Sequence, residues 1–206
     1  MNSQPLNLDT ILAAAIFAAQ KHQGQVRKDL QASPYVTHPL TVARLIYTIG
    51  EIEDQDILIA ATLHDTIEDT DAQPEEIGDR FGMDVLAMVL EVSDDKSLAK
   101  MCRKQLQVIH APRLSYPARI IKLADKIANC TDILRTPPAD WSLSRRQDYI
   151  QWAADVVFQM RGTNAPLEQA FDELLAEAEA LLNFHLEPFD TVSNRAWGPG
   201  ANDTCE

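Results

Sequence analysis

Four residues in three separate segments have side chains that bind divalent metal ions: His38, the neighbours His64 and Asp65, and Asp125. Imidazole nitrogens combined with carboxylate oxygens suit manganese, iron or zinc. Such a set leaves coordination positions for water and a phosphoryl oxygen, which a hydrolytic metal site needs. Each piece alone is weak evidence, because a His-Asp pair arises by chance and Asp125 could simply pair with a basic neighbour. Together the residues predict one metal-binding site.

Two acidic residues follow at helical spacing, since Glu68 is four residues after His64 and Asp69 is four after Asp65. In one α-helix each pair would share a face, which places Glu68 and Asp69 one turn beyond the metal ligands. From there the carboxylates could orient or deprotonate an attacking water. The surrounding segment is rich in Ile, Leu and Ala, and burying acidic groups there is costly unless they are paired or bind a cation. A purely structural role would have to explain that cost.

Helices are the elements expected to position these residues, because apolar residues recur at helical spacing along almost the whole chain. The sequence therefore predicts an all-α fold, a single helical bundle. Pro39 suits the first position of a helix, with His38 just outside it. The expected helices cover residues 9–22, 39–49, 55–69, 74–81, 84–91, 98–110, 116–134, 142–161 and 166–183.

The charge balance limits the classes of partner. A net charge of −13 argues against general binding to nucleic acids or membrane surfaces, which requires a basic field. The apolar stretches are too short to cross a bilayer, and the N-terminus does not resemble a secretory signal, so we expect a cytoplasmic protein. An anionic substrate must then meet a local basic patch, although such residues could also form a solvated helix face. Candidates are Arg27, Lys28, Lys96, Lys100, Arg103, Lys104, Lys122 and Lys126.

One domain accounts for the chain. Its length allows a core that folds without disulfides or partners, and no change in composition divides it. We expect this domain to cover residues 1–183. Residues 184–206 are rich in Gly, Pro, Asn and Asp and predict a flexible C-terminal tail. Oligomeric state is left open by these patterns.

Three motifs carry a resemblance to the hydrolase domain of Rel/SpoT proteins. The first spans residues 21–28 and 34–39 (PYVTHP), the second residues 60–70 (AATLHDTIEDT), and the third residues 121–126 (IKLADK), followed by Asn129. Their order and spacing also match. The sequence is most similar to the stand-alone small alarmone hydrolases and metazoan SpoT homologues, a group of HD-domain enzymes. The resemblance covers residues 11–182.

Membership of that group would imply one Mn²⁺ ion per chain, held by His38, His64, Asp65 and Asp125. Glu68 and Asp69 would then be the catalytic acidic pair. The implied substrates are the guanosine alarmones ppGpp and pppGpp. Water activated by the acidic pair would attack the phosphorus on the ribose 3′ oxygen, leaving GDP or GTP and pyrophosphate. The ion would act as Lewis acid and water activator.

The resemblance also implies a set of substrate-binding residues. Arg27 and Lys28 would lie beside the base and sugar, Asn129 near the nucleoside, and Lys100 and Tyr149 near the phosphates or ribose. Tyr149 could equally be a packing aromatic residue, and Asn129 an amide on a helix surface. The sequence departs from the long Rel/SpoT proteins at two nearby positions, which puts the details of base recognition in doubt. These are Ala128 in place of a usual histidine and Asp132 in place of a frequent threonine.

Two alternative functions remain open. The first is a related enzyme with another substrate, because the stand-alone group is also associated with removing the 2′-phosphate of NADPH and with adenine alarmones. The second is a nucleotide-sensing HD module without catalysis. Intact Glu68 and Asp69 argue against this second alternative.

Overall fold

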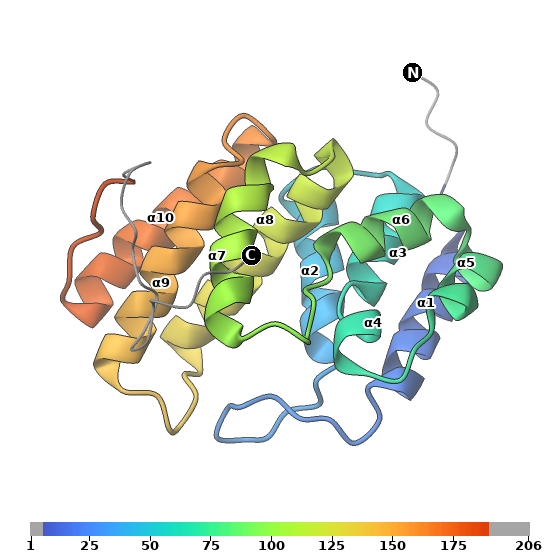
Figure 1. The fold of residues 1–206 in the computed structure, drawn as a ribbon, viewed down its shortest axis with the longest axis horizontal. Coiled ribbons are helices and arrows are strands. Elements are labelled where there is room, and N and C mark those ends of the chain that lie inside the picture. Colours follow the sequence, from blue (N-terminus) through green and yellow to red (C-terminus); the bar gives the residue numbers. More distant parts are fainter. Residues whose placement is uncertain (1–5, 190–206) are drawn as a thin grey trace.

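The computed structural model describes residues 6–189, and every named element within that range is a helix (Figure 1). An isolated β-bridge joins Val26 and Pro34 in the loop after the first helix. The helical elements of the described residues confirm the all-α prediction. The helices are α1 Leu8–Lys21, α2 Thr37–Thr48, α3 Gln55–Leu63, α4 Thr66–Asp69, α5 Pro74–Phe81, α6 Met83–Val92, α7 Lys100–His110, the 3₁₀ turn η1 Ala111–Arg113, α8 Tyr116–Arg135, α9 Leu143–Phe158 and α10 Ala165–Leu182.

Several helices begin at a polar side chain that caps the free backbone N–H groups of the first turn. The Asn7 side chain accepts hydrogen bonds from the first turn of α1, and Asp54 does the same for α3. Ser142 caps α9, and Asn164 caps α10. These local signals explain why most helix boundaries lie close to those expected from the sequence.

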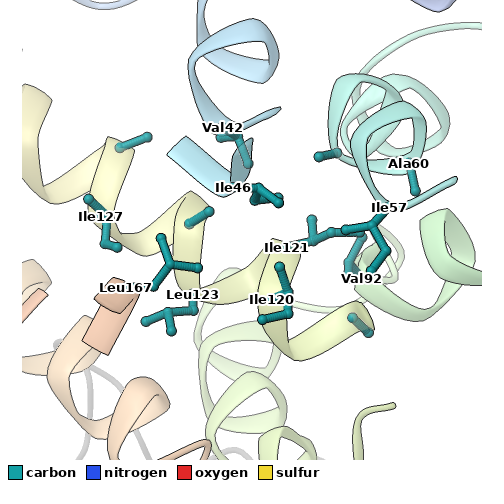
Figure 2. Close-up of a cluster of buried hydrophobic side chains, with 14 of the residues drawn as sticks. Val42, Ile46, Ile57, Ala60, Val92, Ile120, Ile121, Leu123, Ile127 and Leu167 are labelled. Atoms are coloured by element: carbon teal, nitrogen blue, oxygen red, sulfur yellow. The ribbon is translucent and has the colours of Figure 1, made fainter. Parts of the chain in front are cut away.

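Helix α8 runs through the centre of the core and carries the third motif. It packs against α2 and α10, while α2 also packs against α3. Figure 2 shows Ile120, Ile121 and Leu123 of α8 beside Val42 and Ile46 of α2, with further core side chains from α3, α6 and α10. The buried run of α8 continues through Asp125 and Lys126, so charged groups lie inside the bundle. Packing on several sides therefore fixes the position of Asp125.

The expected single helix over residues 55–69 is wrong, because α3 ends at Leu63 and α4 begins at Thr66. The His64 Nδ1 atom bonds the Ala61 carbonyl at 2.8 Å, and the Thr66 hydroxyl donates to the Leu63 carbonyl at 2.6 Å. In an uninterrupted helix those carbonyls accept from backbone N–H groups four residues later, so the side chains compete with the helix. His64 and Asp65 consequently lie in the turn between α3 and α4.

The expected position of His38 outside its helix is also wrong. Helix α2 begins at Thr37, so His38 is its second residue and is buried, with Pro39 immediately after it. A proline is tolerated there because the N–H groups of the first turn have no partner inside the helix. His38 therefore has the orientation that a helix imposes.

The domain boundary at residue 183 remains a prediction. Helix α10 ends at Leu182 with Asn183 in the left-handed conformation, and the structure describes only residues 184–189 of the expected tail. The rest of that tail, residues 190–206, lies outside the described residues. None of the described helices has the length and apolar character needed to span a membrane.

Candidate metal centre and active site

The predicted metal ligands converge between α2, the α3–α4 turn and α8. Ligand atoms of His38, His64 and Asp65 all lie within 4.8 Å of one another. Asp125 completes the group, because its Oδ1 atom lies 3.1 Å from His38 Nε2 and 3.8 Å from His64 Nε2. His38 and Asp125 are 87 positions apart in the chain. The fold thus brings together the four side chains that the sequence suggested.

The electrostatics of this cluster favour a positive charge at its centre. Burial alone would lower the pKa of His64, but Asp65 and Asp125 outweigh burial and raise that pKa to about 10. Burial pushes the pKa values of both aspartates upward, yet His64 and His38 hold that of Asp65 below its usual value, and Lys126 and His38 do the same for Asp125. The carboxylates therefore stay ionised and attract a proton or a metal ion.

The geometry of His64 fits a metal ligand. Its Nδ1–H donates to the Ala61 carbonyl, so when a metal ion takes the place of the second ring proton, the lone pair that binds it lies on Nε2. Nε2 is buried and has no hydrogen-bond partner in the described part of the chain. It lies 3.1 Å from Asp65 Oδ1. Two electron-rich atoms at this distance are compatible when a cation is shared between them, so the residues present fit a divalent ion.

Glu68 and Asp69 lie one turn beyond the ligands, as expected, although α4 is a separate helix. The Asp69 N–H donates to the Asp65 carbonyl at 2.8 Å, which keeps helical spacing across the turn. Glu68 accepts a hydrogen bond from the Asp94 N–H at 2.9 Å. Burial is the largest cause of a raised pKa at Glu68. A raised pKa makes this carboxylate a stronger proton acceptor than an exposed glutamate.

Two adjoining cavities meet beside this cluster. One has a volume of ≈ 230 Å³ and is lined by the metal-ligand group, Glu68, Asp69 and several lysines. The other, of ≈ 240 Å³, is lined by Arg27, Lys28 and more apolar groups. They share Tyr35, Asn129 and Tyr149. Small-molecule sites usually exceed about 300 Å³, so a nucleotide needs both cavities together.

The predicted substrate-binding residues all line these cavities. Arg27 and Lys28 belong to the apolar one, where Arg27 is ion-paired with Asp132. Lys100 lines the metal-side cavity. Asn129 lies at the junction, and its Nδ2 atom also donates to Asp125 Oδ1 at 2.6 Å. Tyr149 is at the junction as well, with its ring between those of Trp141 and Trp152.

Helix α7 supplies cations to the metal-side cavity. Lys100, Arg103 and Lys104 all line it. Lys104 Nζ lies 5.4 Å from the Tyr149 ring centre and 4.7 Å from that of Trp152, which are cation–π distances. Burial, followed by the nearby charges of Lys100 and Lys126, lowers the pKa of Lys104 to about 8. A bound phosphate would favour the protonated, positively charged form of these lysines.

Two further residues contact the ligands: Tyr35, to which the sequence assigned no role, and Lys126, which the sequence suggested only as part of a basic patch. The Tyr35 hydroxyl donates to Asp65 Oδ2 at 2.6 Å and lies 3.3 Å from Asp69 Oδ2, so it links the metal ligands to the acidic pair. Lys126 Nζ lies 2.9 Å from Asp125 Oδ2 and is buried. Both residues lie inside the sequence motifs that contain the ligands, Tyr35 near His38 and Lys126 next to Asp125. Their position in these motifs is the signal that could have identified them.

Comparison with known proteins defines the class. The family model described as "HD domain" matches residues 14–153. The chain therefore belongs to the HD-domain family, whose members depend on a metal ion. This confirms the resemblance inferred from the three motifs.

More particular matches are found among metazoan SpoT-like hydrolases. The chain is 51% identical over 167 residues to guanosine-3′,5′-bis(diphosphate) 3′-pyrophosphohydrolase MESH1 of Xenopus tropicalis, covering 81% of this chain and 93% of that protein. It is 47% identical to human MESH1 over the same length and coverage. A solved structure, described as "A metazoan ortholog of SpoT hydrolyzes ppGpp and plays a role in starvation responses", matches with a TM-score of 0.81 and 43% identity. That match covers 85% of this chain and 97% of the other.

Proposed function

We propose that this protein is a metal-dependent 3′-pyrophosphohydrolase that converts ppGpp and pppGpp to GDP and GTP with release of pyrophosphate. One observation carries the proposal: the metal-ligand cluster and the acidic pair open into a second cavity of mixed apolar and basic character. We place the nucleoside in the second cavity, with its ribose beside Tyr35, Asn129 and Tyr149, which line both cavities. The relatives named for this activity support the same substrate.

The ion that we propose is Mn²⁺, one per chain, held by His38, His64, Asp65 and Asp125. The mixed nitrogen and oxygen donors suit manganese, although iron and zinc accept them too. When bound, a divalent ion supplies Lewis acidity to the phosphoryl oxygens and makes water more acidic.

The acidic pair would move the protons. Glu68 and Asp69 lie on the metal-side cavity, where one of them takes a proton from the attacking water. The water oxygen forms a bond to the phosphorus on the ribose 3′ oxygen, and the bond between that phosphorus and the 3′ oxygen breaks. The 3′ oxygen takes up a proton, so GDP or GTP leaves with a free 3′ hydroxyl and pyrophosphate is released.

Substrate binding would be divided between the cavities. Lys100 is a cation for the phosphates on the metal side, and burial together with neighbouring cations lowers its pKa. Arg27 and Lys28 contact the base and sugar in the other cavity. Tyr149 and Asn129 hold the ribose at the junction.

A product assay tests the function. Purified protein is incubated with ppGpp and MnCl₂, and the products are separated by ion-exchange chromatography. We expect GDP and pyrophosphate in equal amounts, and none with the Asp65→Ala variant, which has lost a ligand. Orthophosphate in place of pyrophosphate, or no product, would remove the assignment.

The same assay separates the alternatives. Specificity constants for ppGpp, pppGpp, an adenine alarmone and NADPH decide whether another ribose phosphate is preferred. Binding of ppGpp without turnover by the parent protein would favour a sensor. A cytoplasmic location and a small-molecule nucleotide as partner fit this function, and oligomeric state is open.

A further inference from the structure

The loop 93–99, between α6 and α7, contacts both carboxylates of the acidic pair. Lys96 Nζ lies 2.5 Å from Asp69 Oδ1 and 3.2 Å from Glu68 Oε1. Two residues earlier, the Asp94 N–H donates to Glu68 Oε2. The Asp94 side chain is fixed in turn by Gln107 of α7, whose Nε2 atom donates to it at 2.8 Å. The loop thus reaches both carboxylates and is anchored on a long helix.

The acidic pair needs such support because its own element is short. Helix α4 is a single turn, from Thr66 to Asp69. Consecutive helix residues point about 100° apart, so Glu68 and Asp69 do not face each other by helix geometry alone. Two adjacent carboxylates also repel each other at close range. A cation that contacts both oxygens offsets the repulsion and fixes their separation.

We propose that Lys96 is a positioning residue, which holds Glu68 and Asp69 together in the arrangement that accepts a proton from the attacking water. This inference rests on the proposed function, because it requires the pair to be catalytic. Lys96 acts through the two carboxylates and does not contact the substrate. A role in phosphate binding, which the sequence left open for this lysine, is disfavoured because its ammonium group is already engaged by two anions.

The environment of Lys96 makes the inference testable. Its side chain is 46% exposed, and an ion pair at such a site contributes little to stability. Replacing Lys96 should therefore leave the fold intact. The chain also offers a matched control. Lys21 Nζ bridges Asp71 and Glu76 at 3.3 and 2.8 Å, a similar arrangement outside both cavities.

The experiment compares Lys96→Met, Lys96→Arg and Lys21→Met with the parent by steady-state kinetics on ppGpp with Mn²⁺, with metal content and thermal unfolding measured on each. We expect Lys96→Met to lower kcat by about 10- to 100-fold with KM within about twofold, because misplaced catalytic groups affect the transition state and not binding. Lys96→Arg should recover most of the turnover, since a guanidinium can also pair with two carboxylates. Lys21→Met should match the parent.

Three results would overturn the proposal: an unchanged kcat in Lys96→Met, a raised KM with normal kcat, or no recovery by arginine in a folded, metal-loaded protein. The second result would instead show that Lys96 binds phosphate. A parallel assay on a chromogenic p-nitrophenyl phosphate ester separates this proposal from the substrate assignment. If the parent cleaves the ester but not ppGpp, the substrate is wrong and the Lys96 variants are judged on the ester. If it cleaves neither, both proposals fail.

Discussion

Asp65 and Glu68 are three residues apart, yet the structure gives them different surroundings. Asp65 faces His38 and His64, whereas Glu68 faces the Asp94 N–H and Lys96. We expect Asp65→Ala, like His64→Ala, to abolish metal binding and turnover together. Glu68→Ala should keep the metal and lower kcat by about 10²- to 10⁴-fold, the usual contribution of a general acid or base. Metal analysis beside kinetics checks both, and a metal-free Glu68 variant would contradict the role assigned to Glu68.

Lys104 gives the site a pH dependence. Its pKa of about 8 means that the ammonium form, which we expect to pair with the substrate phosphates, is lost as pH rises through that value. We therefore expect KM for ppGpp to rise between pH 7 and pH 9, by about tenfold if one charge-assisted contact is lost. Lys104→Arg keeps its charge across this range and should show a much flatter profile. Equal profiles for the two proteins would mean that Lys104 does not contact the phosphates.

At the scale of elements, Gly50 sets how closely the end of α2 approaches α10. A Cβ atom at Gly50 would lie 2.7 Å from the Ile46 carbonyl oxygen and 3.0 Å from Leu167 Cδ1. Backbone cannot move aside cheaply, so we expect Gly50→Ala to cost about 1–3 kcal/mol, as overpacking does. Thermal unfolding should show a Tm lower by roughly 2–10 °C for a chain of this size.

Gly78, in α5, is the control for that substitution. A Cβ there would meet only side-chain atoms, Met83 Sδ at 3.1 Å and Leu86 Cδ2 at 3.3 Å. Alanine is also a better helix former than glycine by about 0.5–1 kcal/mol. Gly78→Ala should therefore leave Tm unchanged or raise it. Equal losses in the two variants would contradict the close approach of α2 and α10.

At the scale of the whole molecule, metal binding should raise the stability of the folded chain. The ligands come from α2, the α3–α4 turn and α8, so they are assembled only in the folded chain. An ion that binds only the folded state at about 100 times its Kd adds about 2.7 kcal/mol. We expect Mn²⁺ to raise Tm and EDTA to reverse the rise, as followed by calorimetry. The Asp65→Ala variant should not respond, and a Tm independent of Mn²⁺ in the parent would argue against the site.

The sequence by itself determined the helical class, most helix boundaries and the candidate residues of the site. Helical periodicity and capping residues such as Asp54 and Ser142 act over a few positions, so they can be read locally. The short family motifs likewise identify His38, His64, Asp65 and Asp125 as candidate ligands without any knowledge of the segments between them.

Only the folded structure shows how these residues meet. The break between α3 and α4 follows from side chains of His64 and Thr66 that compete with backbone N–H groups for backbone carbonyls. The spacing of apolar residues does not predict which donor bonds the carbonyl. The contact between His38 and Asp125, and that of Lys96 with the acidic pair, depend on packing between segments far apart in the chain. The first of these contacts arises because the core fixes α8 against α2. The free energy of this packing belongs to the assembled bundle and to no single segment.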